Sequence, residues 1–179
     1  MNPLKQLNIG FVGLSLGKHE FSFGIDDAFF ACFEYSEVTK GNLQLDLLLE
    51  KQNNMLVLDF LIKGFVELVC DHCLETYQQS LEIERRLYVK FGDAFSEQTD
   101  EIIVIPVGES HFDVSQFVYE YVHLALPMQR IHAEDGVPGR GCDPAIVEKL
   151  NQYLAGKRPA GQTGENSPWE ALKGLKFKD

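Results

Sequence analysis

The sequence predicts an α+β fold in which a β-rich antiparallel sheet or partial barrel, with a candidate zinc knuckle, is followed by two or three helices. Hydrophobic and polar residues alternate through the first two-thirds of the chain, and a helical pattern replaces this alternation near residue 113. A Cys-x-x-Cys pair separates two of the predicted strands. At 45% hydrophobic and 11% aromatic residues, the chain can bury a sizeable core.

Six stretches are predicted as strands. In "NLQLDLLLE" every second residue from 43 to 49 is leucine, which is typical of a half-buried strand. A second strand follows Asn53-Asn54, a dipeptide that tolerates the positive φ of a hairpin turn. Residues 81–91 alternate again, although Arg85 interrupts their apolar face, and Pro106 places "EIIVIPV" at a sheet edge or strand end. "LNIGF" and "HEFSF" add two strands near the start.

The helices are expected at the end of the domain. Apolar residues from 114 to 125 recur at helical spacing, Asp113 suits the N-cap with Gln116 at the capping-box position, and Phe112 with Phe117 matches a hydrophobic staple. Pro127 should end this helix, because the residue before a proline avoids helical angles. A second helix is predicted at "CDPAIVEKLNQYL", where Asp143 caps the helix and Pro144 occupies its first position.

The predicted organisation is a single β-rich α+β domain over residues 1–154, a flexible linker over 155–168 and a short helical tail over 169–179. No stretch reaches the roughly 18 apolar residues of a membrane span, and the N-terminus lacks the features of a signal peptide. We therefore expect a cytoplasmic protein with reduced thiols.

The formal charge of −11 argues against a general nucleic-acid surface, since phosphate binding depends on Lys and Arg. Residues 97–135 alone contain eight acidic residues against one arginine, whereas residues 157–179 have a net charge of +2. This distribution favours a basic partner, such as a ribosomal protein, over naked RNA. The alternative is an acidic surface that only keeps the protein soluble.

The cysteines are the clearest chemical signal. Two thiolates from a Cys-x-x-Cys between antiparallel strands can bind one tetrahedral ion, and a glycine-rich loop downstream supplies a histidine and a third cysteine. The predicted ligands of a structural zinc are Cys70, Cys73, His132 and Cys142. His72 is an alternative to His132, and Cys32 is expected to be a small buried hydrophobe.

Two other interpretations of the cysteine pair remain. Cys70 and Cys73 could be inert small residues at a turn, or they could form a redox dithiol that exchanges disulfides. A redox pair normally opens a helix, whose N-terminus lowers the thiol pKa, but a strand pattern follows here. The chain also lacks GxGxxG, P-loop, GxSxG and HExxH motifs, so its residues do not indicate an enzyme, and no small-molecule substrate is expected.

The order of these features resembles the large ribosomal RNA subunit accumulation protein family, also called YceD-like, over roughly residues 40–179. The resemblance rests on "VCDHCLE", on the run from Glu120 to Pro127 in "EYVHLALP", on a later cysteine and on the tail "PWEALKGLK". It implies a non-enzymatic ribosome-biogenesis factor that supports large-subunit rRNA accumulation. It also implies that Cys70, Cys73, His132 and Cys142 match positions of the family's pattern, although "AEDGVPGRG" is inserted before Cys142.

Overall fold

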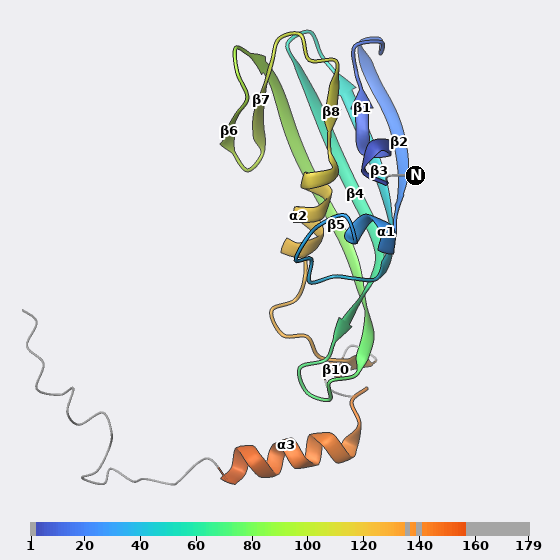
Figure 1. Ribbon diagram of the computed structural model, residues 1–179, viewed down its shortest axis with the longest axis vertical. Helices are drawn as coiled ribbons and strands as arrows, with labels where there is room; N and C mark the ends of the chain where they lie inside the picture. Colours follow the sequence, from blue (N-terminus) through green and yellow to red (C-terminus); the bar gives the residue numbers. More distant parts are fainter. Residues whose placement is uncertain (1–2, 135–136, 139–140, 157–179) are drawn as a thin grey trace, which may run out of the picture. The chain divides into compact units, whose positions relative to one another are not determined.

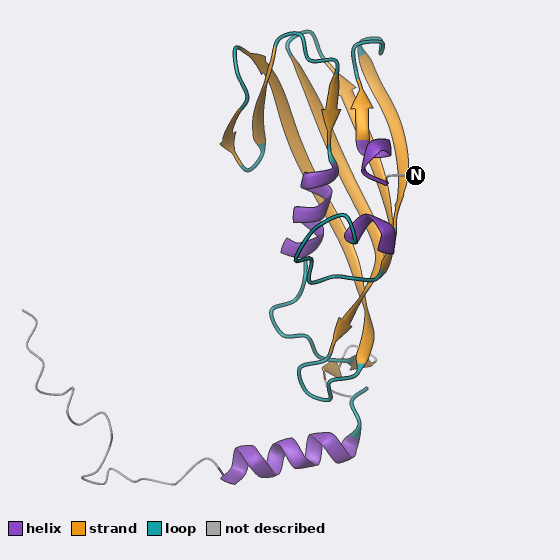
Figure 2. Ribbon diagram, viewed as in Figure 1, coloured by secondary structure: helices purple, strands orange, loops and turns teal. Residues whose placement is uncertain are grey.

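The computed structural model describes residues 3–134, 137–138 and 141–156, and the chain divides into two units, residues 1–130 and 131–179. The first unit is built on an open six-stranded sheet with strand order β2-β3-β4-β5-β7-β6 (Figures 1 and 2). Its strands are β2 (Gly17–Ile25), β3 (Gly41–Lys51), β4 (Met55–Val69), β5 (Thr76–Gly92), β6 (Ser96–Thr99) and β7 (Ile102–Pro106). All neighbours are antiparallel except β5 and β7. The predicted α+β fold class is confirmed, and of the two predicted arrangements the structure has the open sheet and not the partial barrel.

The alternating residues form the sheet as the pattern predicts. The four leucines at positions 43, 45, 47 and 49 of β3 are all buried, while Gln44 and Asp46 are exposed. The β3–β4 hairpin turns at Asn53-Asn54, where the Gln52 amide donates to the Met55 carbonyl at 2.9 Å. Neither asparagine adopts a positive φ, so this turn does not use the conformation that the dipeptide tolerates.

One face of the sheet is covered by the remaining elements of the first unit. These are η1 (Pro3–Leu7), β1 (Asn8–Gly10), α1 (Asp27–Phe30), β8 (His111–Asp113) and α2 (Ser115–Leu124). β1 and β8 pair with each other as a separate antiparallel ribbon, which Figure 1 shows beside α2 on the same side of the sheet. Their apolar side chains join those of the sheet in one buried core, in which the rings of Phe60 and Tyr121 meet edge to face.

Helix α2 confirms the predicted periodic segment. The Phe112 and Phe117 rings stack at 5.6 Å between centroids, which is the expected staple, and the Asp113 carboxylate accepts from the Ser115 amide at 2.8 Å. Val114 rather than Asp113 is the N-cap residue, and Gln116 donates to Glu120 instead of completing a capping box. The helix ends at Leu124, three residues before Pro127.

The described part of the second unit contains β9 (Ala133–Glu134), β10 (Val137–Pro138) and α3 (Pro144–Gly156). β9 and β10 form a short antiparallel pair, and α3 begins as predicted, with the Asp143 carboxylate accepting from the Ala145 amide at 2.8 Å. Most of the predicted linker and the whole tail helix lie outside the described residues. In the part of the chain described here, every helix is too short or too polar to cross a membrane.

Candidate metal centre

The turn between β4 and β5 has the backbone of a metal knuckle. The Cys70 amide donates to the Glu75 carbonyl at 2.9 Å, and the Leu74 amide donates back to the Cys70 carbonyl at 3.0 Å. Leu74 has φ 62°, a left-handed conformation that tightens the turn after Cys73. The His72 amide points at the Cys70 sulfur, with 3.4 Å between N and Sγ. A hydrogen bond to sulfur favours the thiolate, which is the form that binds metal.

The structure brings all four predicted ligands together. One donor atom from each of Cys70, Cys73, His132 and Cys142 lies within 4.8 Å of the others. Zinc–sulfur bonds of about 2.3 Å at tetrahedral angles place two sulfurs roughly 3.8 Å apart, so this spacing fits a closed four-ligand site. The three cysteines are at most 6% exposed, which keeps competing water away from their sulfurs.

His132 is held in an orientation that suits a ligand. Its Nδ1 lies 2.9 Å from the Gly141 carbonyl oxygen, and because a carbonyl can only accept, Nδ1 must carry the hydrogen. Nε2 is then the nitrogen with the lone pair, and a partner on the other ring nitrogen is the usual support of a metal-binding histidine. A Cβ added to Gly141 would lie 3.1 Å from the His132 Cβ, so the close approach of these segments depends on glycine here.

Asp71, which sequence reasoning passed over, fixes the chain just before His132. The Asp71 amide donates to the Arg130 carbonyl at 2.6 Å, and the Arg130 amide donates to the Asp71 carboxylate at 2.8 Å. The Arg130 guanidinium also pairs with Glu37. In the sequence, only the acidic character of Asp71 between Cys70 and Cys73 indicated such a contact. Asp71 thus attaches the turn that carries Cys70 and Cys73 to Arg130, two residues before the candidate ligand His132.

Other predicted residues lie elsewhere. His72 is half-buried and does not belong to the group of four among the described residues. The expectation that Cys32 is buried is wrong, because it is exposed just after α1, where its thiol donates to the Ala28 carbonyl at 3.3 Å. β5 begins three residues after Cys73, so the knuckle does not open a helix that could lower the thiol pKa.

The family comparison gives one match. A family model described as large ribosomal RNA subunit accumulation protein YceD matches residues 58–176, which span the knuckle, α2 and both downstream ligands. Neither a curated protein nor a solved structure matches the chain at a significant level.

Proposed function

The chain belongs to the YceD family of large ribosomal RNA subunit accumulation proteins, and on that premise we propose that it is a non-enzymatic ribosome-assembly factor of the cytoplasm. Its role is to support accumulation or processing of large-subunit rRNA. The family match over residues 58–176 carries the proposal, because it covers the chain from near the start of β4 to the C-terminal tail.

Zinc is the metal best suited to the Cys-His group. Three thiolates and one imidazole are soft to borderline ligands that select zinc over calcium or magnesium. Cys70, Cys73, Cys142 and Nε2 of His132 would fill a tetrahedral shell completely, and no ligand position would remain for substrate. Bound there, zinc supplies folding stability rather than chemistry, so the protein acts as a zinc-stapled adaptor.

The partner is expected to be a basic protein of the large subunit or a large-subunit assembly factor. A chain with a net charge of −11 attracts basic proteins and repels free RNA phosphate. rRNA contact is therefore either indirect, through such a partner, or local, through the basic residues of the tail.

Deleting the gene tests this proposal. Loss of the protein should lower the ratio of large- to small-subunit rRNA, and the wild-type gene should restore it. Cys70→Ser and Cys142→Ser should restore it poorly, whereas Cys32→Ser, which removes an exposed cysteine outside the group, should restore it fully. An unchanged rRNA ratio in the deletion strain would contradict the assignment. Full rescue by Cys70→Ser would contradict the proposed role of zinc but not the role in rRNA accumulation.

A further inference from the structure

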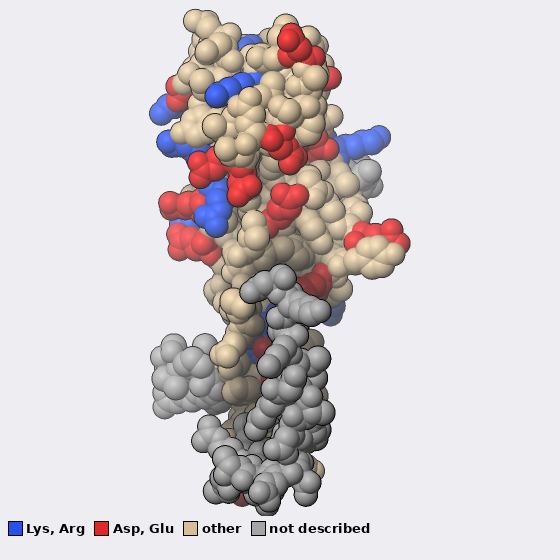
Figure 3. All heavy atoms as spheres, turned by 90° about the vertical axis from the view of Figure 1, so that its left-hand side faces the viewer, with Lys and Arg blue, Asp and Glu red and all other residues tan. Residues whose placement is uncertain are grey.

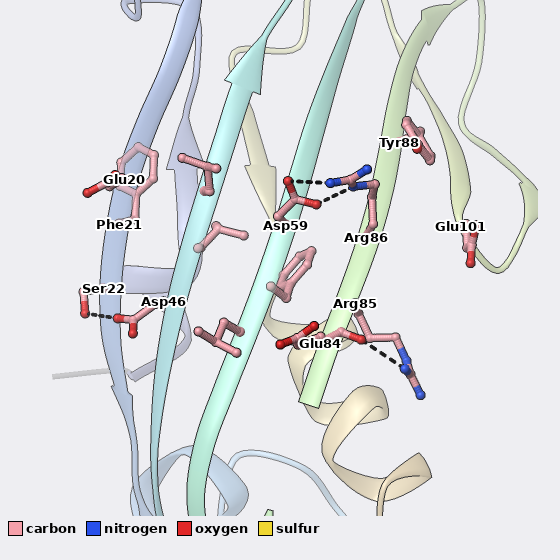
Figure 4. A pocket seen from close by; sticks show the side chains of 14 residues that line it. Glu20, Phe21, Ser22, Asp46, Asp59, Glu84, Arg85, Arg86, Tyr88 and Glu101 are labelled. Atoms are coloured by element: carbon pink, nitrogen blue, oxygen red, sulfur yellow. Dashed lines mark hydrogen bonds and ion pairs between the residues drawn. The ribbon is translucent and has the colours of Figure 1, made fainter. Parts of the chain in front are cut away.

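The face of the sheet opposite the core carries a regular pattern of acidic and apolar side chains. We call it the open face, and it comprises Glu20, Ser22, Asp46, Leu48, Asp59, Leu61, Glu84 and Arg86. In Figure 4 α2 lies behind the sheet, and every side chain of the open face is exposed or half-buried. They line a shallow hollow that extends across β2, β3, β4 and β5.

The strand register arranges these residues in two adjacent rows. One row reads Glu20, Leu48, Asp59, Arg86, and the next reads Ser22, Asp46, Leu61, Glu84. Each leucine is half-buried and has a carboxylate on the strand to either side. Because neighbouring strands lie about 4.8 Å apart, the two carboxylates that flank a leucine are separated by roughly 10 Å.

The open face carries more negative than positive charge. Lys63, two residues beyond Leu61 on β4, pairs with Glu82, and its charge also interacts with Glu84 and Asp46. The guanidinium of Arg86 donates two hydrogen bonds to Asp59, which raise the pKa of Arg86. The positive charge of Arg86 is therefore paired with Asp59 and not with the other carboxylates of the open face. Figure 4 shows Arg85 turned away from Glu20 and Asp46, and its guanidinium donates to the Glu84 backbone carbonyl. None of the ion pairs within the described residues involves Glu20, Asp46 or Glu84.

We propose that the open face binds an extended, lysine- and arginine-rich segment of a protein partner. A long basic side chain can lay its aliphatic stem on Leu48 or Leu61 and direct its charge to the carboxylates on either side. The two rows are two residues apart along the strands, about 7 Å, which is also the spacing of alternate side chains in an extended peptide.

Other occupants fit less well. RNA would bring phosphate charges against Glu20, Asp46 and Glu84, and a second copy of this chain would oppose the same carboxylates with its own. The exposed acids of residues 97–120 are an alternative surface, and Figure 3 shows acidic side chains gathered on the side of the molecule that carries β6 and β7. The open face differs because its carboxylates alternate with half-buried leucines. The inference deepens the proposed function by giving the basic partner a docking site.

The experiment compares two full-length variants with the same change in charge. E20Q/D46N/E84Q neutralises the open face, and D93N/E97Q/E109Q neutralises three exposed acids that do not line the hollow. The probe is a labelled ten-residue peptide in which lysine alternates with threonine, measured by fluorescence anisotropy at low salt. We expect the open-face variant to bind about tenfold more weakly and the control to change by less than about threefold. Circular dichroism verifies that both variants fold.

Several results would overturn the inference. Equal weakening in both variants would mean that the peptide reports only net charge, and the absence of binding to the native chain would remove the site altogether. A third full-length variant, K173Q/K176Q/K178Q, removes charge from the tail; tighter peptide binding would identify the tail as the occupant. None of these outcomes changes the rRNA ratio of the deletion strain, so the inference and the proposed function fail separately.

Discussion

Strand β4 and the knuckle that follows it belong to the same β4–β5 hairpin but depend on different interactions. Along β4 the core side is filled by Leu58, Phe60 and Ile62, each at most 2% exposed, so apolar burial determines its stability. The turn from Cys70 to Leu74 instead contains sulfurs, backbone hydrogen bonds and a strained φ at Leu74. We therefore expect the sheet to fold without metal, whereas the geometry of the turn depends on it.

The largest effect is expected from a substitution in the sheet core. Ile62→Ala should lower the free energy of unfolding by about 2–5 kcal/mol, because it leaves a cavity beside fully buried neighbours. Leu61→Ala removes as many carbons from the preceding residue, which lies half-buried on the open face, and should cost about 1 kcal/mol or less. Urea unfolding at constant zinc gives both values. Similar losses for the two would mean that the two faces do not differ in burial.

A smaller effect should appear at high pH. Burial raises the pKa of Tyr121 to about 12, so the folded state retains a phenolic proton that the unfolded chain releases near pH 10. The folded state binds more protons in this window, and stability should therefore fall as pH rises from about 10 to 12, by at most about 3 kcal/mol. Denaturant midpoints measured from pH 9 to 11.5 check this. Tyr121→Phe should remove that part of the pH dependence, and an unchanged slope would show that Tyr121 is not responsible.

The smallest expected effect is on metal binding at the knuckle, with the stability of the sheet unchanged. Asp71→Ala removes the carboxylate that accepts from the Arg130 amide, and should raise the rate of zinc loss to a chelator about tenfold, an effect typical of groups that support metal ligands. Its unfolding midpoint in urea should stay close to that of the native chain. As a control, Asp93→Ala removes an exposed acid outside the hollow and the knuckle. If Asp71→Ala releases zinc at the native rate, the Asp71–Arg130 contact has no bearing on the metal.

Most of the sheet could be predicted from sequence because a strand with one buried face alternates with period two. β3, β4 and β5 follow this rule through all but a few residues, and α2 follows the helical period equally clearly. The parallel pairing of β5 with β7 could not be predicted. It arises because β6 lies at the outer edge of the sheet and β7 lies between β6 and β5, an order that the alternation of residues does not determine. α1 has only four residues, too few for a periodic signal, although Asp26 caps it through two backbone amides.

The Cys-His group was predictable from its donor types, because three cysteines and a histidine form a set that zinc favours. Its supporting contacts were not. The Asp71–Arg130 pair joins residues 59 apart in the chain. The His132–Gly141 hydrogen bond uses a backbone carbonyl, which every residue has, so no residue type in the sequence indicates it. Cys32 was misjudged for a related reason: its aromatic neighbours in the sequence point into the core, while the thiol itself follows α1 at the surface.

The most direct test of this account is zinc content per chain, measured on full-length protein purified without chelator. We predict about one zinc per native chain. Cys70→Ser and Cys142→Ser should lose it, while Cys32→Ser should retain it. Zinc-free native protein, or zinc that persists in both Cys70→Ser and Cys142→Ser, would contradict the claim that these residues form a structural metal site.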